Sequence, residues 1–224
     1  AQRRTLRDYP YIQREDFRIY NRPSESEKGA GEMLELRGIS KIYNPGTVTE
    51  LCLFDDFSFK VADGEFVSVV GSNGSGKTSM LNIICGSIPV SGGEVLIDGK
   101  NINSLREYKR YRMIGRVYQN PAAGTCPDMT ILENMSLADN KGKRYGLSFG
   151  VNNSRKNYYK EQLSSLGLGL EDKLDAKLGA LSGGQRQAVS LLMATLTPID
   201  FLILDEHTAA LDPRTAEIIM ELTD

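Results

Sequence analysis

Residues 71–78 constrain the fold of this chain more than any other stretch. Their sequence, Gly-Ser-Asn-Gly-Ser-Gly-Lys-Thr, matches the phosphate-loop pattern G-x-x-x-x-G-K-[ST] at every fixed position. The mainly apolar residues 66–70 before it are typical of a short buried strand, and the apolar residues after it recur at helical spacing. A strand, a glycine-rich turn and a helix in this order predict an α/β fold with a phosphate site at the start of the helix.

Each residue type in this loop has a chemical role. The glycines let the backbone approach a polyphosphate, and the free N–H groups at the helix start present partial positive charge to it. Lys77 would reach the outer phosphates, and the Thr78 hydroxyl can be a ligand of Mg²⁺. A glycine turn that merely caps a helix needs neither a lysine nor a hydroxyl at these two positions. We predict that the nucleotide-binding residues here are Gly71, Ser72, Asn73, Gly74, Ser75, Gly76, Lys77, Thr78 and Ser79.

Residues 181–185, Leu-Ser-Gly-Gly-Gln, predict a second helix start. Ser182 and Gln185 have the spacing of a capping box, so the pair also has a purely structural interpretation. Gly183 and Gly184 are poor residues for a first helical turn, since each costs about 1 kcal/mol relative to alanine. Two glycines at this place suit the close approach of a ligand to exposed N–H groups. We therefore favour a second anion-binding helix start.

Two acids follow a strand near the end of the chain. Residues 201–204 form a continuous apolar run, as expected for a strand covered on both faces in a parallel sheet. Asp205 and Glu206 follow at its carboxyl end, where ligands bind in open α/β sheets. Neighbouring side chains of a strand point in opposite directions, so Asp205 could face Mg²⁺ and Glu206 the water that attacks the terminal phosphate. A pair of surface acids would not need the apolar run before it.

Composition excludes several other classes of protein. A formal charge of −2 gives no argument for broad binding to nucleic acid or anionic lipid, and 224 residues with 40% hydrophobic content can form a real core. The 3 cysteines are odd in number and widely spaced, which fits reduced thiols in a cytosolic protein better than disulfides or a zinc site. Because no apolar run reaches the length of a membrane span, a role at a membrane would need a partner.

The remaining patterns outline the domain. Residues 1–32 are polar, charged in both signs and rich in turn formers, so we expect a leader or linker outside the core, possibly the tail of an upstream or fused segment. Strand patterns cover residues 34–39, 51–54 and 57–61, a basic helix is predicted at 105–112, and helical spacing begins at Thr130. The basic, tyrosine-bearing stretch 141–160 is interpreted as a solvated surface rather than a partner contact.

Several of these motifs together resemble the nucleotide-binding domain of ABC transporters. They are the phosphate loop, Gln119, the Leu-Ser-Gly-Gly-Gln string, and Leu-Asp-Glu at 204–206 running into Ala-Leu-Asp at 210–212. The resemblance covers residues 33–224 and implies an α/β fold of the P-loop NTPase type, the ABC cassette. Such a cassette has a mostly parallel core sheet, an antiparallel β subdomain and a helical subdomain.

The resemblance also implies roles for single residues. Tyr43 would stack on the adenine of ATP, and Gln119 would lie in the lid loop between the metal site and a membrane partner. Glu206 would be the general base, and Asp212 the acid that links the two sites of a dimer. The Mg²⁺ ligands would be Thr78, Gln119 and Asp205, the catalytic residues Glu206, Gln119 and Lys77, and the second-copy contacts Ser182, Gly183, Gly184 and Gln185.

The family resemblance implies partners too. In this family the signature of one copy closes over the phosphate loop of a second copy, so that two ATP molecules lie in a head-to-tail dimer. Permease subunits would hold the dimer at the cytoplasmic face of the cell membrane, and an extracytoplasmic substrate-binding protein would deliver the solute. Residues 42–48, 115–121 and 205–213 look like those of bacterial importers for tryptophan or tyrosine, so a small solute such as an aromatic amino acid is expected.

The sequence departs from the family in two places. His207 follows Glu206 where many ABC domains have proline, and we expect it to be a loop residue without a switch role. The switch histidine would fall beyond Asp224, so residues 33–224 are expected to be truncated before it, with weak or absent turnover in isolation. A soluble ABC ATPase not coupled to transport, an exporter ATPase and a regulator without catalysis remain alternatives, although Lys77, Asp205 and Glu206 favour an enzyme.

Overall fold

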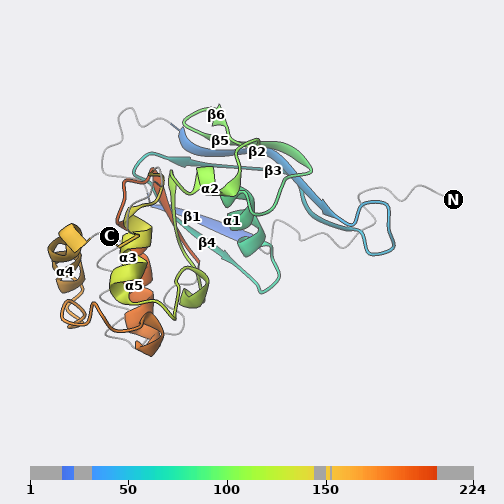
Figure 1. The fold of residues 1–224 in the computed structure, drawn as a ribbon. Coiled ribbons are helices and arrows are strands. Elements are labelled where there is room, and N and C mark those ends of the chain that lie inside the picture. Colours follow the sequence, from blue (N-terminus) through green and yellow to red (C-terminus); the bar gives the residue numbers. More distant parts are fainter. Residues whose placement is uncertain (1–16, 23–31, 144–149, 152, 206–224) are drawn as a thin grey trace. The chain divides into compact units, whose positions relative to one another are not determined.

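The structure is a computed structural model that describes residues 17–22, 32–143, 150–151 and 153–205. The chain divides into two compact units, residues 1–110 and 111–224, and each is described by itself. Figure 1 shows their elements in sequence colours.

An antiparallel sheet dominates the first unit. Its strand order is β3-β2-β5-β6, with bounds β2 Glu32–Tyr43, β3 Leu51–Ala62, β5 Gly92–Ile97 and β6 Lys100–Asn101. Leu34, Leu36 and Ile39 of β2 are buried, as their spacing predicts. The two separate strands predicted at 51–54 and 57–61 form one strand. Register shifts along the β2–β3 pair and a positive φ at Asp56 accommodate the polar residues between them.

The strand before the phosphate loop, β4 (Phe66–Gly71), pairs antiparallel with β1 (Phe17–Arg22). We expected residues 1–32 to lie outside the core as a leader, and the structure instead pairs six of them with β4. Residues 17–22 alternate partly between apolar and polar types, and the charge of the whole segment hid this short strand pattern. Helix α1 (Lys77–Cys85) follows the loop and lies between the β1–β4 pair and the antiparallel sheet (Figure 1).

A buried arginine completes the carboxyl end of α1. Arg110 ends the short helix α2 (Glu107–Arg110), where a longer helix over 105–112 was predicted. Its guanidinium donates hydrogen bonds to the carbonyls of Ile83 at 2.9 Å and Ile84 at 3.0 Å, which are among the last of α1. Burial lowers the pKa of Arg110. A side chain at Gly86 would place its Cβ only 2.7 Å from the arginine Nε.

Replacing Arg110 with Met should destabilise the chain by about 2–4 kcal/mol, because buried helix carbonyls lose a charged donor while the apolar bulk remains. Urea unfolding followed by circular dichroism measures this loss. Lys109→Met is the matched control, since Lys109 is an exposed residue of the same short helix, and it should change stability by less than about 0.5 kcal/mol. Equal losses in the two variants would contradict the role given to Arg110.

The second unit is mainly helical. Strands β7 (Ile114–Val117) and β8 (Phe201–Leu204) form a parallel pair with Val117 opposite Leu204, the one parallel pairing among the described strands. Ile203 is the one buried residue of β8 and the other three are partly exposed, whereas the apolar run predicted cover on both faces. The helices are η3 Pro121–Ala123, α3 Ile131–Asp139, η4 Asn153–Arg155, α4 Lys156–Ser164, η5 Leu178–Ala180 and α5 Gly183–Thr195.

A buried polar cluster joins α3 to α4 and corrects one prediction. We interpreted residues 141–160 as a solvated surface, but Tyr159 is fully buried and its hydroxyl donates to Asp139 Oδ2 at 2.9 Å. Arg155 and Lys143 form ion pairs with the same carboxylate. Burial raises the pKa of Tyr159, and the hydrogen bond to Asp139 raises it further. Two basic residues of this stretch, Lys143 and Arg155, therefore pair with a buried acid from an earlier helix, which a local charge pattern cannot reveal.

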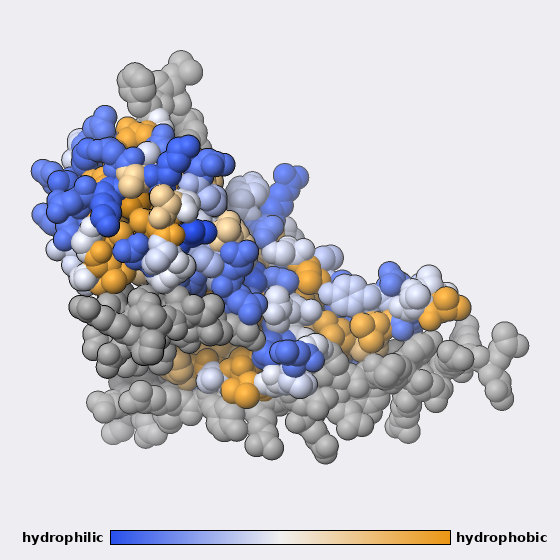
Figure 2. All heavy atoms as spheres, turned by 90° about the horizontal axis from the view of Figure 1, so that it is seen from below, coloured by the Kyte–Doolittle hydropathy of each residue, from blue (hydrophilic) through white to orange (hydrophobic). Residues whose placement is uncertain are grey.

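The surface is mixed in polarity, as Figure 2 shows for one face. Among the described residues, none of the helices is both long enough and apolar enough to cross a membrane. In the part of the chain that the structure describes, the exposed large hydrophobic side chains are Val48, Leu51, Phe66, Val70, Tyr108 and Leu137.

Candidate nucleotide-binding site

The phosphate loop has a backbone that only glycine adopts easily at two places. Gly74 and Gly76 have φ values of 85° and 93°, in the left-handed region. A Cβ at Gly76 would also lie 3.1 Å from the ring of Phe54 and 3.3 Å from Leu53, so position 76 is both strained and crowded. The N–H of Ser75 donates to the carbonyl of Ser72 at 3.2 Å and closes the turn. The turn leads directly into α1, whose first residue is Lys77.

The charged end of Lys77 lies against this turn. Its Nζ donates to the carbonyl oxygens of Gly71 at 2.7 Å and Ser72 at 3.0 Å. No described side chain caps α1, and the Thr78 hydroxyl belongs to an exposed residue. The buried Ser75 hydroxyl has no hydrogen-bond partner within the described residues. The loop thus gathers an ammonium group and a helix start that carries partial positive charge, which is the chemistry that a polyphosphate requires.

The second glycine-rich helix start forms as predicted. Ser182 is the N-cap of α5, its Oγ accepts from the Gln185 N–H at 3.2 Å, and the Ser182 N–H donates to Gln185 Oε1 at 3.2 Å. The capping-box interpretation is therefore confirmed. A Cβ at Gly183 would meet open space, so nothing described covers that position. Binding of an anion here stays a prediction.

Gln119 and Asp205 follow the two parallel strands of the second unit at the same edge. The Asp205 N–H donates to the carbonyl of Val117, the last residue of β7, at 3.0 Å. Asp205 Oδ2 lies 3.4 Å from a terminal nitrogen of Arg116, and the two side chains are 13% and 3% exposed. Gln119 is exposed two residues beyond the end of β7. The pairing of β7 with β8 therefore brings these two predicted residues to one edge.

The predicted residues fall into two groups, one in each unit. Tyr43 ends β2 in the first unit, which also holds the phosphate loop, and the Lys41 Nζ lies 4.8 Å above the centre of the Tyr43 ring. Gln119, Asp205 and the start of α5 belong to the second unit. The three further predictions Glu206, His207 and Asp212 lie outside the described residues.

Comparison with known proteins decides the family. Residues 54–209 match the protein family described as ABC transporter. This chain belongs to the ABC transporter family. A tyrosine transport ATP-binding protein of Clostridioides difficile strain R20291 is 45% identical over 192 residues, which are 86% of this chain and 76% of that protein. The chain is thus an ABC ATP-binding subunit, and its cassette is that of an ABC ATPase.

Other relatives extend this picture of the ABC cassette. The ribose import ATP-binding protein RbsA of Lactococcus lactis subsp. cremoris is 33% identical over 82% of this chain, which spans only 35% of that protein. The dimeric post-hydrolysis structure of the cassette MJ0796, bound to ADP and Pi, is similar with a TM-score of 0.71 and 30% identity, over 85% of this chain and 81% of that one. The predicted P-loop NTPase fold of the ABC type is confirmed.

Two polar residues of the ABC cassette escaped the sequence analysis. Arg116 is a buried cation in an otherwise apolar strand, and this contrast was the available signal that it needs a buried partner. Gln187 is 2% exposed on α5, and its Nε2 donates to the carbonyl of Tyr118 at 3.2 Å. A polar side chain among the apolar positions of a helix was the corresponding signal here.

The oxygen donors of the cassette suit Mg²⁺. A threonine hydroxyl, a carboxylate and an amide oxygen at Thr78, Asp205 and Gln119 are the ligand types that this ion prefers, with phosphate oxygens and water completing its octahedron. Within the described residues, Arg116 contacts Asp205 at 3.4 Å, a distance longer than that of a tight ion pair. Thr78, Asp205 and Gln119 are thus each a suitable type of ligand, and their joint binding of the ion stays a prediction.

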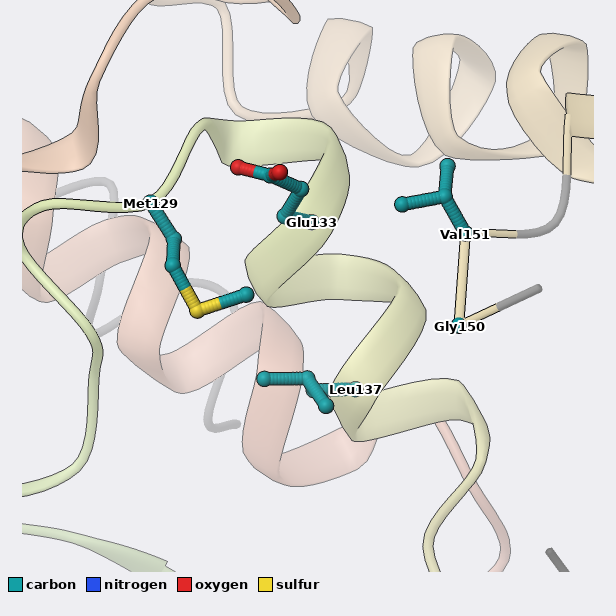
Figure 3. A pocket seen from close by; sticks show the side chains of 5 residues that line it. All are labelled: Met129, Glu133, Leu137, Gly150 and Val151. Carbon is teal, nitrogen blue, oxygen red and sulfur yellow. The ribbon is translucent and has the colours of Figure 1, made fainter.

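A cavity of about 320 Å³ lies on another part of the second unit. Figure 3 shows Glu133 and Leu137 on α3, with Met129 on one side and Val151 across from them. The carboxylate of Glu133 accepts hydrogen bonds from the Thr130 N–H at 2.7 Å and hydroxyl at 2.9 Å, and the backbone hydrogen bond lowers its pKa. The described residues that line this cavity include none of the predicted nucleotide residues.

Proposed function

We propose that this chain binds and hydrolyses Mg·ATP and thereby powers an importer of a small solute, with an aromatic amino acid such as tyrosine as the cargo. The observation that carries the proposal is the 45% identity, across 86% of the chain, to a tyrosine transport ATP-binding protein. The geometry of the phosphate loop supports the nucleotide part of the proposal independently, because Lys77 and the start of α1 meet at one turn.

The residues would share the work as follows. Phosphate oxygens replace the Gly71 and Ser72 carbonyls as acceptors for Lys77, and the N–H groups of the loop bind the same phosphates. Thr78, Gln119 and Asp205 would hold Mg²⁺, which neutralises phosphate charge when bound. The Tyr43 ring stacks on adenine. Glu206 accepts the proton of the attacking water, and this role is a proposal from the family motif alone.

A second copy of the chain is part of the proposal. The start of α5, with open space at Gly183, would face the phosphate loop of the partner copy, and Asp212 would link the two sites. ATP that contacts both copies only in the closed dimer favours closure by binding, and hydrolysis restores the open state. Permease subunits would hold the dimer at the cytoplasmic face of the membrane and follow this motion, with an extracytoplasmic binding protein delivering the solute.

Transport in proteoliposomes tests the proposal. The chain should be reconstituted with the permease that copurifies with it, and ATP-dependent uptake of radiolabelled tyrosine and of ribose should be measured. We expect uptake of tyrosine and none of ribose. Uptake of ribose in place of tyrosine would refute the proposed cargo. ATP hydrolysis that no permease or solute changes would instead favour the soluble ATPase not coupled to transport.

A further inference from the structure

We propose that Arg116 is a positioning residue for Asp205: it is the built-in counter-ion that compensates and orients this carboxylate while no metal-bound nucleotide is present. The inference rests on the proposed function in one respect, namely that Asp205 is a ligand of Mg²⁺.

Burial and position give the first argument. Arg116 lies on β7 opposite Ile203 of β8, and Ile203 comes two residues before Asp205 in the chain. The Arg116 side chain is only 3% exposed and the Asp205 side chain 13%. A carboxylate withdrawn from water to this extent is costly unless a positive charge lies beside it. Arg116 supplies that charge from the neighbouring strand, at 3.4 Å from Asp205 Oδ2.

Contacts around Arg116 give the second argument, because they hold the guanidinium in place independently of Asp205. Its central carbon lies 4.4 Å from the centre of the Tyr118 ring, a stacking arrangement that arginine forms readily. The Tyr118 hydroxyl is 2.8 Å from that of Tyr111, and the Tyr118 carbonyl accepts from the buried Gln187 side chain. The arginine is therefore oriented toward Asp205 by groups that do not bind nucleotide.

The contact distance gives the third argument. A strong arginine–carboxylate pair makes two hydrogen bonds at about 2.7–2.9 Å, whereas the contact between Arg116 and Asp205 within the described residues measures 3.4 Å. At this distance the charges attract, but the carboxylate oxygens are not saturated with hydrogen bonds. Asp205 therefore remains able to accept a second cation without first breaking a tight pair.

Thermal unfolding with and without ligand tests the proposal. Replacing Arg116 with Met should lower the Tm of the nucleotide-free chain by about 5–10 °C, since a buried charge loses its partner. With saturating Mg·ADP, the difference in Tm between the Arg116→Met variant and the original chain should shrink to less than half, because a bound cation then compensates the charge of Asp205. Arg112→Met is the matched control at an exposed arginine, and Arg116→Lys, which keeps the charge, should retain most of the Tm.

A double-mutant cycle separates positioning from mere packing. In an Asp205→Asn background residue 205 is neutral. Arg116→Met should therefore lower the Tm there by less than a third of the decrease that it causes in the original chain. If Arg116→Met does not fold, Arg116→Gln, which also removes the charge but keeps a polar side chain, gives the same comparison in both backgrounds. Equal losses in both backgrounds, unchanged by Mg·ADP, would overturn the proposal. Strong coupling in a chain that Mg·ADP does not stabilise would support the ion pair and refute the proposed function.

Discussion

Replacing Lys77 with Ala will weaken ATP binding by about 100-fold, because two charge-assisted hydrogen bonds to phosphate oxygens, at about 1.5 kcal/mol each, are lost. The ammonium already lies at the turn, where it donates to the carbonyls of Gly71 and Ser72. Binding of a triphosphate therefore exchanges acceptors and needs little rearrangement of the side chain. Isothermal titration calorimetry with ATP in the presence of Mg²⁺ measures the change.

The control for Lys77 is Lys109→Ala, at an exposed lysine of the same unit, and this variant should bind ATP as the original chain does. Thermal unfolding without nucleotide shows whether either variant has lost structure, since the two carbonyl contacts of Lys77 disappear as well. An unchanged ATP affinity in a folded Lys77→Ala chain would contradict the role assigned to this residue and to the loop.

Replacing Glu206 with Gln should lower the rate of ATP hydrolysis by about 10²–10⁴-fold, since an amide cannot accept the proton of the attacking water. ATP binding should survive, because the neutral amide keeps the size of the side chain and removes a negative charge near the phosphates. Dimers with bound ATP should then accumulate. Phosphate release measures the first effect, and analytical ultracentrifugation with ATP measures the second.

Asp200→Asn provides the matched control for Glu206. Asp200 is an exposed acid at the opposite end of β8, so the same change of acid to amide there should leave hydrolysis and dimerisation as they are. If Glu206→Gln alters neither hydrolysis nor dimerisation, the enzyme interpretation fails and a nucleotide-binding regulator without catalysis takes its place.

Sequence reasoning succeeded where a motif dictates its own local geometry. The phosphate loop and α1 follow from glycines that need positive φ, and the cap of α5 follows from Ser182 and Gln185 alone. Strand β2 of the first unit follows from its alternation of apolar residues. In each of these cases the residues that decide the structure are neighbours in the chain.

Sequence reasoning failed where partners are far apart in the chain. Tyr159 and Asp139 are separated by 20 positions, and Arg116 and Asp205 by 89, so no periodicity shows that one needs the other. The pairing of β1 with β4 was missed for the same reason. The family resemblance supplied the roles proposed for Tyr43 and Gln119, but it could not indicate buried groups such as Arg116 and Gln187.

The hydrogen bond between Gln187 and the Tyr118 carbonyl has a mechanical consequence. It connects α5, the helix that begins at the Leu-Ser-Gly-Gly-Gln string, to the backbone just before Gln119. The Gln187 side chain that donates this hydrogen bond is almost wholly shielded from water. A rotation of α5 must therefore carry the end of β7 with it, or leave a shielded amide and a carbonyl without partners at a cost of about 1–3 kcal/mol each. Movement at one of these two segments is thus transmitted to the other.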